Sequence, residues 1–124
     1  MADEITVDLE FIVSKDPFYF KYDLGAQTYD LSGAGGGNPG LVSVGTSEED
    51  IDFGDVTGEG ILFMKNLDAA SDVDWGVQDT TMKAIGTLKV GGIPAILNIK
   101  SGTTLRMQST GGGAAKCYIG RFEV

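Results

Sequence analysis

The sequence of 124 residues contains no histidine and a single cysteine, Cys117. Without histidine, the chain can form neither a Ser-His-Asp or Cys-His catalytic group nor the imidazole zinc sites that are common in proteins. One cysteine can form neither an internal disulfide nor a thiolate cluster, so a secreted disulfide framework is excluded and a reducing compartment fits. Cys117 alternates with Ala115 and Ile119, which predicts a buried, inert thiol.

Long hydrophobic runs and positive charge are also scarce. No apolar segment approaches the length of a transmembrane helix, and the acidic residues 1–10 differ from the basic start of a signal peptide. We therefore expect a soluble protein, synthesised in the cytoplasm, with no membrane partner. The formal net charge is −9, which argues against direct nucleic-acid binding because phosphate contacts need clustered lysine and arginine.

The few positive charges are unevenly distributed. Residues 1–82 contain three lysines against seventeen acidic residues, whereas residues 83–124 contain six lysines and arginines against Glu123 alone. Opposite charges can meet across neighbouring strands of one sheet, which is the interpretation we favour because such pairs are common. The alternative is a dipolar surface that suits head-to-tail contact or a partner.

Glycine, in contrast, is abundant, with 19 residues, and proline is rare, with three. Most glycines lie between short apolar runs, where turns need left-handed backbone. No segment shows a sustained helical period, and at most one helical turn is expected, at residues 80–84. Strand candidates recur at the spacing of a sandwich or barrel. The sequence therefore predicts an all-β fold, a single antiparallel β-sandwich domain over residues 1–124 that is jelly-roll-like and has little or no helix.

The segment Gly60–Val77 is the centre of this prediction. Its apolar run, residues 61–64, is short and is closed by a polar turn at residues 66–68, which predicts a strand buried on both faces. Apolar residues alternate around Trp75 in the next strand. The chain's only tryptophan is therefore expected to anchor the core.

The remaining elements are placed by alternation and by turn residues. A half-buried strand is expected from Ile5 to Ser14, and a second strand begins after Pro17 and ends at Gly25. Ser32–Gly40 predicts a glycine-rich loop that lacks the Lys-Ser/Thr pair of a phosphate-binding loop. Residues 48–55 predict an acidic, solvated loop or strand edge. Three later turns are expected, the first closing a tight hairpin; they lie at Gly91-Gly92, Ser101-Gly102 and Gly111–Gly113.

No set of residues predicts catalysis, and we expect neither a catalytic residue nor a cofactor. Calcium is the most credible ion, because carboxylates supply the hard oxygen ligands that it prefers. Plain acidic turns are the interpretation that we favour, since neither candidate set has the spacing of an EF-hand loop. The candidate ligands are Asp68, Asp72 and Asp74, with Asp50, Asp52 and Asp55 as a second set.

Aromatic residues offer a second kind of site. Tyr19, Tyr29 and Tyr118 are consistent with a carbohydrate-binding module, because sugars stack on flat aromatic rings. In alternating strands, however, aromatic side chains more often pack in the core or across strands.

From about Gly60 to the C-terminus, the sequence resembles a small β-sandwich family of virion proteins in tailed bacteriophages. The shared pattern is an apolar strand with an Asn-Leu-Asp turn, a strand with an aromatic residue before glycine, a glycine turn with a proline, and a final strand. These features are residues 61–68, Trp75-Gly76-Val77, residues 88–95 and Lys116–Val124.

The resemblance implies a non-enzymatic virion structural protein, above all a capsid decoration (cement) protein on the capsid exterior. It implies binding to the major capsid protein and to copies of the chain itself, as a trimer or dimer. The N-terminal strand and the Ser32–Gly40 loop are then candidates for extended arms, and the basic C-terminal third for contact with an acidic shell. A tail or neck component of the virion and a carbohydrate-binding module are the alternatives.

Overall fold

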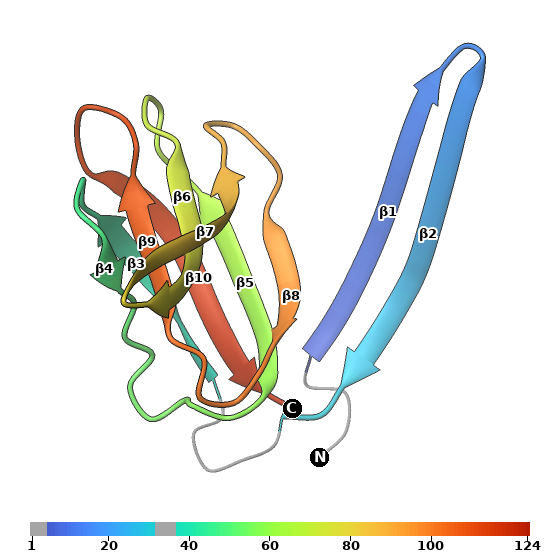
Figure 1. Cartoon of the computed structure of the whole chain (residues 1–124). Coiled ribbons are helices and arrows are strands. Elements are labelled where there is room, and N and C mark those ends of the chain that lie inside the picture. The colour runs from blue at the N-terminus through green and yellow to red at the C-terminus, as the bar shows by residue number, and fades with distance from the viewer. Residues whose placement is uncertain (1–4, 32–36) are drawn as a thin grey trace. The chain divides into compact units, whose positions relative to one another are not determined.

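Short alternating runs of apolar and polar residues form strands along most of the chain, and the computed structural model describes residues 5–31 and 37–124. These residues contain no helix, and therefore none that could cross a membrane. All strand pairs are antiparallel, so the predicted all-β antiparallel sandwich with little or no helix is confirmed (Figure 1). The strands are β1 (Ile5–Lys15), β2 (Phe18–Tyr29), β3 (Gly37–Val44), β4 (Glu49–Asp50), β5 (Gly60–Asn66), β6 (Val73–Asp79), β7 (Thr81–Leu88), β8 (Ala95–Ile99), β9 (Leu105–Ser109) and β10 (Ala115–Glu123).

Two compact units divide the chain, residues 1–31 and residues 32–124. The first unit contains β1 and β2, which make a two-stranded sheet. The second contains two four-stranded sheets, ordered β3-β10-β5-β8 and β4-β9-β6-β7. The β-sandwich therefore occupies the second unit, whereas the sequence pattern predicts a single domain over residues 1–124.

The pairing within the sandwich is nested. β6 pairs with β7, β5 with β8, β4 with β9 and β3 with β10, so this unit runs like one long hairpin whose arms alternate between the two sheets. Connections on the returning arm consequently cross from sheet to sheet. The tight hairpin predicted at Gly91-Gly92 is wrong, because this turn joins β7 and β8, which belong to different sheets.

The core lies between the two sheets and draws on strands of both (Figure 1). The strand predicted at residues 61–64 is largely buried, as expected, and Trp75 is partly buried and packs against the core. Ile51 and Phe53 are also buried, so the prediction of a solvated segment at residues 48–55 holds only for its acidic side chains. The largest fully buried side chains are Leu62, Met64, Met107, Ile119, Val44, Val73 and Cys117.

Part of the predicted loop Ser32–Gly40 is a strand. Residues 32–36 lie outside the described residues, but residues 37–40 form the start of β3 and pair with β10. A Cβ atom on Gly37 would come within 2.5 Å of the Phe122 ring, and one on Gly120 within 2.9 Å. These glycines therefore make room for an aromatic ring, and the loop prediction is wrong at residues 37–40.

The helical turn predicted at residues 80–84 is also wrong. β6 and β7 form a hairpin there, with Asp79 opposite Thr81 and Thr80 at the tip. Thr80 has a φ of 65°, which is uncommon for a β-branched residue. The turn therefore lacks the glycine or asparagine that would have indicated it.

Candidate binding surfaces

β1 and β2 form a long antiparallel ribbon that turns at the cis Asp16-Pro17 bond (Figure 1). The register runs from Lys15 opposite Phe18 to Ile5 opposite Tyr29, with a shift beside Leu9 that accommodates one extra residue of β2. Gly25 adopts a φ of 66° at this shift. The prediction that the second strand ends at Gly25 is wrong, because β2 continues to Tyr29.

The ribbon has one apolar face and one polar face. Directly opposed residues of an antiparallel pair point to the same side, and sides alternate along each strand. The polar face carries Asp8, Glu10 and Asp23, with the Lys21 ammonium 4.0 Å from the Glu10 carboxylate. On the other face, the Phe11 and Phe20 rings pack edge to face with centroids 6.1 Å apart. The apolar face consists of Ile5, Val7, Leu9, Phe11 and Val13 of β1 and Phe18, Phe20, Tyr22 and Tyr29 of β2, with the polar residues Lys15 and Gln27 on the same side.

Most of these apolar side chains remain exposed. Phe18 is 62% exposed and Leu9 44%, and Phe11, Phe20 and Tyr22 are exposed to a similar degree. The prediction of a half-buried N-terminal strand is therefore wrong. The alternation is present, but the apolar side that it produces is open to solvent.

An exposed apolar face of this kind is unfavourable in water. Full burial of one large apolar side chain is favourable by about 1.5–3 kcal/mol. A two-stranded hairpin alone is only marginally stable, and contiguous apolar patches on soluble monomers commonly mark interaction sites. The ribbon is therefore the strongest candidate for a binding surface in the described chain.

The outward face of the sheet β3-β10-β5-β8 carries a second apolar surface. Leu41 lies opposite Tyr118, and Phe63 lies opposite Ile96, so these side chains form a band across all four strands. The Phe63 and Tyr118 rings pack edge to face with centroids 6.1 Å apart. Leu41, Ile96 and Tyr118 are exposed. We call these four residues the apolar band.

Charges on this outward face have a single sign. By alternation, its outward positions include Lys65 on β5 and Lys116 on β10, and no acidic residue among the described strand residues. The Lys65 ammonium donates a hydrogen bond to the Gly92 carbonyl. The apolar band is therefore flanked by positive charge.

The outward face of the other sheet is polar and internally paired. Arg106 on β9 lies 2.7 Å from the carboxylate of Asp50 on β4 and 3.3 Å from that of Glu48. The hydrogen bond that Arg106 donates to the Asp50 carboxylate raises the pKa of Arg106. Lys89 pairs with Asp72 at 3.2 Å. The cross-strand interpretation of the charge distribution holds for Asp50 and Arg106, which lie opposite each other on β4 and β9. The other two ion pairs each include a residue just outside the strands. These pairs leave less unpaired positive charge in the C-terminal third for contact with an acidic partner.

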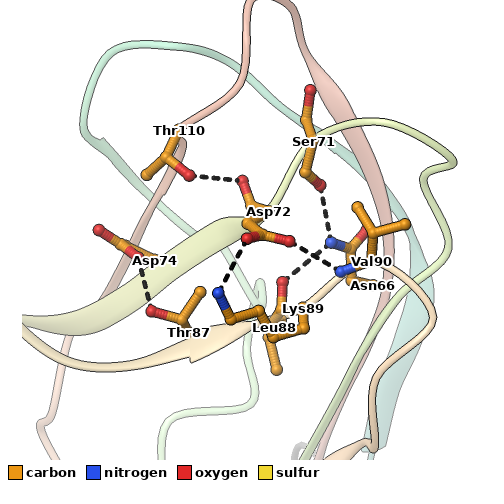
Figure 2. Close-up of polar contacts among 9 residues, drawn as sticks. All are labelled: Asn66, Ser71, Asp72, Asp74, Thr87, Leu88, Lys89, Val90 and Thr110. Atoms are coloured by element: carbon orange, nitrogen blue, oxygen red, sulfur yellow. Dashed lines mark hydrogen bonds and ion pairs between the residues drawn. The ribbon is translucent and has the colours of Figure 1, made fainter.

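A polar network at one end of the sandwich accounts for the Asn-Leu-Asp turn (Figure 2). The buried Asn66 amide donates hydrogen bonds to the carbonyls of Ser71 and Leu88, at 2.8 and 2.9 Å. Its oxygen accepts a hydrogen bond from the Asp68 backbone N–H at 2.8 Å. Asn66 therefore ties the end of β5 to the following connection and to the end of β7, which is a structural role.

The predicted calcium ligands each bind protein donors. The Asp68 carboxylate accepts hydrogen bonds from the N–H groups of Ala70 and Ser71, and these lower its pKa. The Val90 N–H and then the Lys89 side chain lower the pKa of Asp72 (Figure 2). Asp74 accepts a hydrogen bond from the Thr87 hydroxyl at 2.8 Å.

Two members of the second candidate set are likewise bound by donors within the protein. Asp50 pairs with Arg106, and Asp52 accepts a hydrogen bond from the Gly54 N–H at 2.7 Å. Across residues 5–31 and 37–124, no group of three or more His, Cys, Asp or Glu side chains is placed to hold a metal ion. The structure therefore brings neither set together as a metal site, and the acidic turns have structural roles.

The remaining sequence candidates are placed as follows. Cys117 is fully buried, and burial, followed by the charge of Asp68, raises its pKa to about 11, so the thiol stays protonated at neutral pH. The three tyrosines considered for carbohydrate binding are exposed, but they do not share one surface. Tyr29 lies on the apolar face of the ribbon, Tyr19 on its polar face, and Tyr118 in the apolar band of the sandwich.

Sequence reasoning identified the ribbon strands but missed their exposure. A two-residue period shows that a strand has an apolar side, and it carries no information about what covers that side. One available signal was the contrast between the two sides of β1 and β2, acidic on one and aromatic on the other. No model of a known protein family matches the chain, and no curated protein or solved structure shows significant similarity to it.

Proposed function

We propose that the chain is a non-enzymatic structural protein in which the sandwich is a rigid body and the β1–β2 ribbon is an assembly arm. The observation that carries the proposal is the exposed apolar face of the ribbon, with its five aromatic residues Phe11, Phe18, Phe20, Tyr22 and Tyr29. A protein that worked alone would gain stability by losing this surface. Its presence is explained if the face is buried on assembly.

Within that class, we propose a capsid decoration protein of a tailed bacteriophage, bound on the capsid exterior to the major capsid protein and to copies of itself. The nested pairing of β3–β10 supports a jelly-roll sandwich, the fold predicted from the sequence, and a β-sandwich is what the family resemblance implies. Two four-stranded sheets around one core provide a rigid body. An arm with an open apolar face provides the reach that a joint between capsid subunits requires.

Such an arrangement strengthens a shell through many modest contacts. Each bound copy adds its own apolar contact, and linked contacts reinforce one another because the second is made at a high effective concentration. A rigid body limits the conformational entropy that is lost on binding. No reactive group is needed for this function.

Occupancy of expanded capsids tests the proposal. The wild-type chain and the triple variant Phe11→Ser, Phe20→Ser, Tyr22→Ser are mixed with capsids of the phage that encodes the chain, and bound protein is quantified by mass analysis. We expect the triple variant to lose at least tenfold in occupancy. A matched control, Thr6→Ser with Thr28→Ser on the polar face, should bind like the wild type.

Absence of the wild-type chain from purified heads, together with no binding to expanded capsids, would overturn the decoration role. Recovery in the tail fraction would place the protein in the tail or neck. Binding on a glycan array that is lost in Tyr19→Ala or Tyr118→Ala would favour the carbohydrate-binding alternative, which the exposure of those two rings permits.

A further inference from the structure

We infer that the apolar face of the β1–β2 ribbon packs against the same face of a second copy of the chain, so that two ribbons form a four-stranded joint of two layers. The inference rests on the proposed role of the ribbon as an assembly arm and names what the arm binds. The two ribbons run antiparallel about a two-fold axis that lies between them, perpendicular to the strands. In this arrangement β1 lies over β1 of the partner, and β2 over β2.

The exposed area of the ribbon face is sufficient for such a joint. In the described chain, this face carries seven exposed large apolar side chains, against three in the apolar band of the sandwich. Its five aromatic rings, each about half exposed, offer on the order of 500 Å² of apolar surface. Two such faces offer roughly 1,000 Å² from the rings alone, and a stable interface buries about 1,200–2,000 Å² in total. Leu9 and Val13 of each copy add to this area.

Pairing the two apolar faces leaves the charged faces in water. Asp8, Glu10 and Asp23 lie on the opposite side of the ribbon, so in the joint they point outward on both layers. Two sheets pack face to face at about 10 Å, which exceeds the screening length of about 8 Å at physiological salt. Repulsion between the acidic residues of the two copies is therefore small. A two-stranded sheet alone is only marginally stable, and the second layer supplies the apolar cover that it lacks.

The sizes of the side chains along the face favour the antiparallel direction. The two middle rows of the face are Leu9 opposite Gly25, with one side chain, and Phe11 opposite Tyr22, with two rings. Apart from its chain neighbours, no atom lies within 4 Å of a Cβ atom built on Gly25. In the antiparallel joint, Tyr22 lies over the partner's Gly25, and each small row covers a large one. Parallel ribbons would crowd all the rings of these rows into one layer and leave the next layer underfilled.

The charge on the apolar face favours the same direction. Between Ile5 and Tyr29, Lys15 is the one charged residue on this face, and it lies at the turn end of the ribbon. Parallel ribbons would place both lysines at the same end of the joint. Antiparallel ribbons separate them by about 30 Å, because a strand rises about 3.3 Å per residue. Each ammonium then lies beyond the last apolar row of the partner and reaches water.

A two-fold contact of this kind has a defined consequence for assembly. The same patch is used by both copies, so the contact is complete with two chains and does not extend into a filament. The chain is therefore a dimer with two sandwiches joined through their ribbons. Two joined sandwiches attach to a shell more firmly than two separate ones, because the second attaches at a high effective concentration.

Disulfide trapping between two positions on β1 tests the inference. In the antiparallel joint, Val7 of one copy lies over Val13 of the other, whereas the two Val7 residues lie about 20 Å apart along the strands. Single variants Val7→Cys and Val13→Cys are co-expressed, oxidised and measured by intact mass under denaturing conditions. Native Cys117 is buried and does not compete. We expect the mixed dimer to form at least tenfold more than either homodimer.

The matched control uses the neighbouring residues on the polar face. Asp8→Cys and Ser14→Cys lie beside the two test positions but point outward, so they should give no mixed dimer. Trapping of this control pair to the same extent would overturn the inference. Homodimers that dominate over the mixed dimer would also overturn it, because they indicate parallel ribbons. Absence of any disulfide-linked dimer would overturn it in favour of another cover for the ribbon.

Sedimentation of the unmodified chain provides an independent measurement. We expect a dimer, and the triple variant Phe11→Ser, Phe20→Ser, Tyr22→Ser should dissociate at least tenfold more readily, whereas Thr6→Ser with Thr28→Ser should not. Urea unfolding followed by Trp75, which lies in the other unit, checks that the sandwich of each variant is folded. A wild-type monomer at every concentration, or a trimer, would overturn the inference.

The joint and the decoration role fail in different ways. A wild-type chain that occupies capsids but neither dimerises nor traps would remove only this inference. Mixed-dimer trapping by a chain that is absent from heads and does not bind capsids would support the joint and remove the decoration role.

Discussion

The ribbon and the sandwich share one sequence pattern, but its apolar side is exposed in the ribbon and buried in the sandwich. In both, apolar and polar residues alternate along antiparallel strands. On β5, the inward side chains Leu62 and Met64 are covered by a second sheet, whereas on β1 the corresponding side chains are exposed. The two units therefore differ in whether a second sheet covers the apolar side, and not in the alternation of the strand itself.

That comparison shows what alternation can and cannot determine. A two-residue period fixes which side chains share a face, because consecutive side chains point to opposite sides of a strand. Burial depends on whether another layer lies over that face, which is a property of the topology. In the sandwich, the eight strands pair so that two sheets cover each other's apolar sides, whereas residues 5–31 of the ribbon unit contain one pair of strands.

The largest expected difference between the two units is in the free energy of unfolding lost when one leucine of each is replaced by alanine. Leu62→Ala removes a side chain that is 1% exposed and should destabilise the sandwich by about 3–5 kcal/mol, through lost transfer free energy and a residual cavity. Urea unfolding, followed by the fluorescence of Trp75 on β6, reports on this unit.

Leu9→Ala is the matched change in the ribbon. Because Leu9 lies in the other unit and is exposed, the free energy of unfolding reported by Trp75 should change by less than about 0.5 kcal/mol in dilute solution. A loss comparable to that of Leu62→Ala would show that the two units do not unfold independently.

A second prediction concerns the buried polar side chain of Asn66. Asn66→Ala removes two buried hydrogen-bond donors and leaves the carbonyls of Ser71 and Leu88 without this partner. We expect a loss of about 2–4 kcal/mol in the free energy of unfolding. Asn98, which is exposed on β8, provides the control, since Asn98→Ala should cost less than about 0.5 kcal/mol. Equal effects at the two positions would contradict the structural role given to the Asn-Leu-Asp turn.

Sequence reasoning recovered the fold class and most strands, because those follow from local alternation and glycine turns. It placed the buried strand at residues 61–64 and the buried thiol of Cys117 correctly. It misplaced the turn at Gly91-Gly92, because a glycine pair marks a reversal of the chain and does not specify which strand pairs with which. Nested pairing joins residues far apart in the sequence, and no local signal encodes it.

The binding surface was predictable only in part. Extended arms were expected at the N-terminal strand and at Ser32–Gly40, and the ribbon now makes the first of these a two-stranded element. The apolar band was not predicted, since Leu41, Phe63, Ile96 and Tyr118 come from four strands whose register is a tertiary property. The first set of calcium candidates failed to converge because its three carboxylates each accept hydrogen bonds from other backbone or side-chain donors.

A third and smaller test concerns the backbone conformation at a hairpin tip. The β6–β7 hairpin turns at Thr80, which has a φ of 65°. Left-handed backbone costs an ordinary L-residue about 1–2 kcal/mol, and asparagine tolerates it better. Thr80→Asn should therefore stabilise the sandwich by about 1 kcal/mol, raising the urea midpoint measured by Trp75. Thr81→Asn, one residue later within β7, should not stabilise it, because asparagine is disfavoured in strands.

The smallest expected effect is a pH dependence confined to the sandwich. Backbone N–H groups, Ala70 for Asp68 and Val90 for Asp72, hold the pKa values of these two carboxyls below the usual value. A depressed pKa in the folded state means that the unfolded chain binds more protons in acid. The contribution of these groups is therefore complete above the unfolded pKa of about 3.9 and is lost as the pH falls through the lower folded values.

Urea midpoints measured between pH 7 and pH 2 test this dependence. Asp68→Asn and Asp72→Asn should each be less stable than the wild type near neutral pH and should show a flatter decline in acid, because the titrating group is gone. Asp8→Asn on the ribbon is the control and should leave the acid slope of the Trp75 signal unchanged, since it lies in the other unit. If the wild-type slope persists in both sandwich variants, other carboxylates govern acid unfolding, and the network at the end of β5 contributes little to stability at neutral pH.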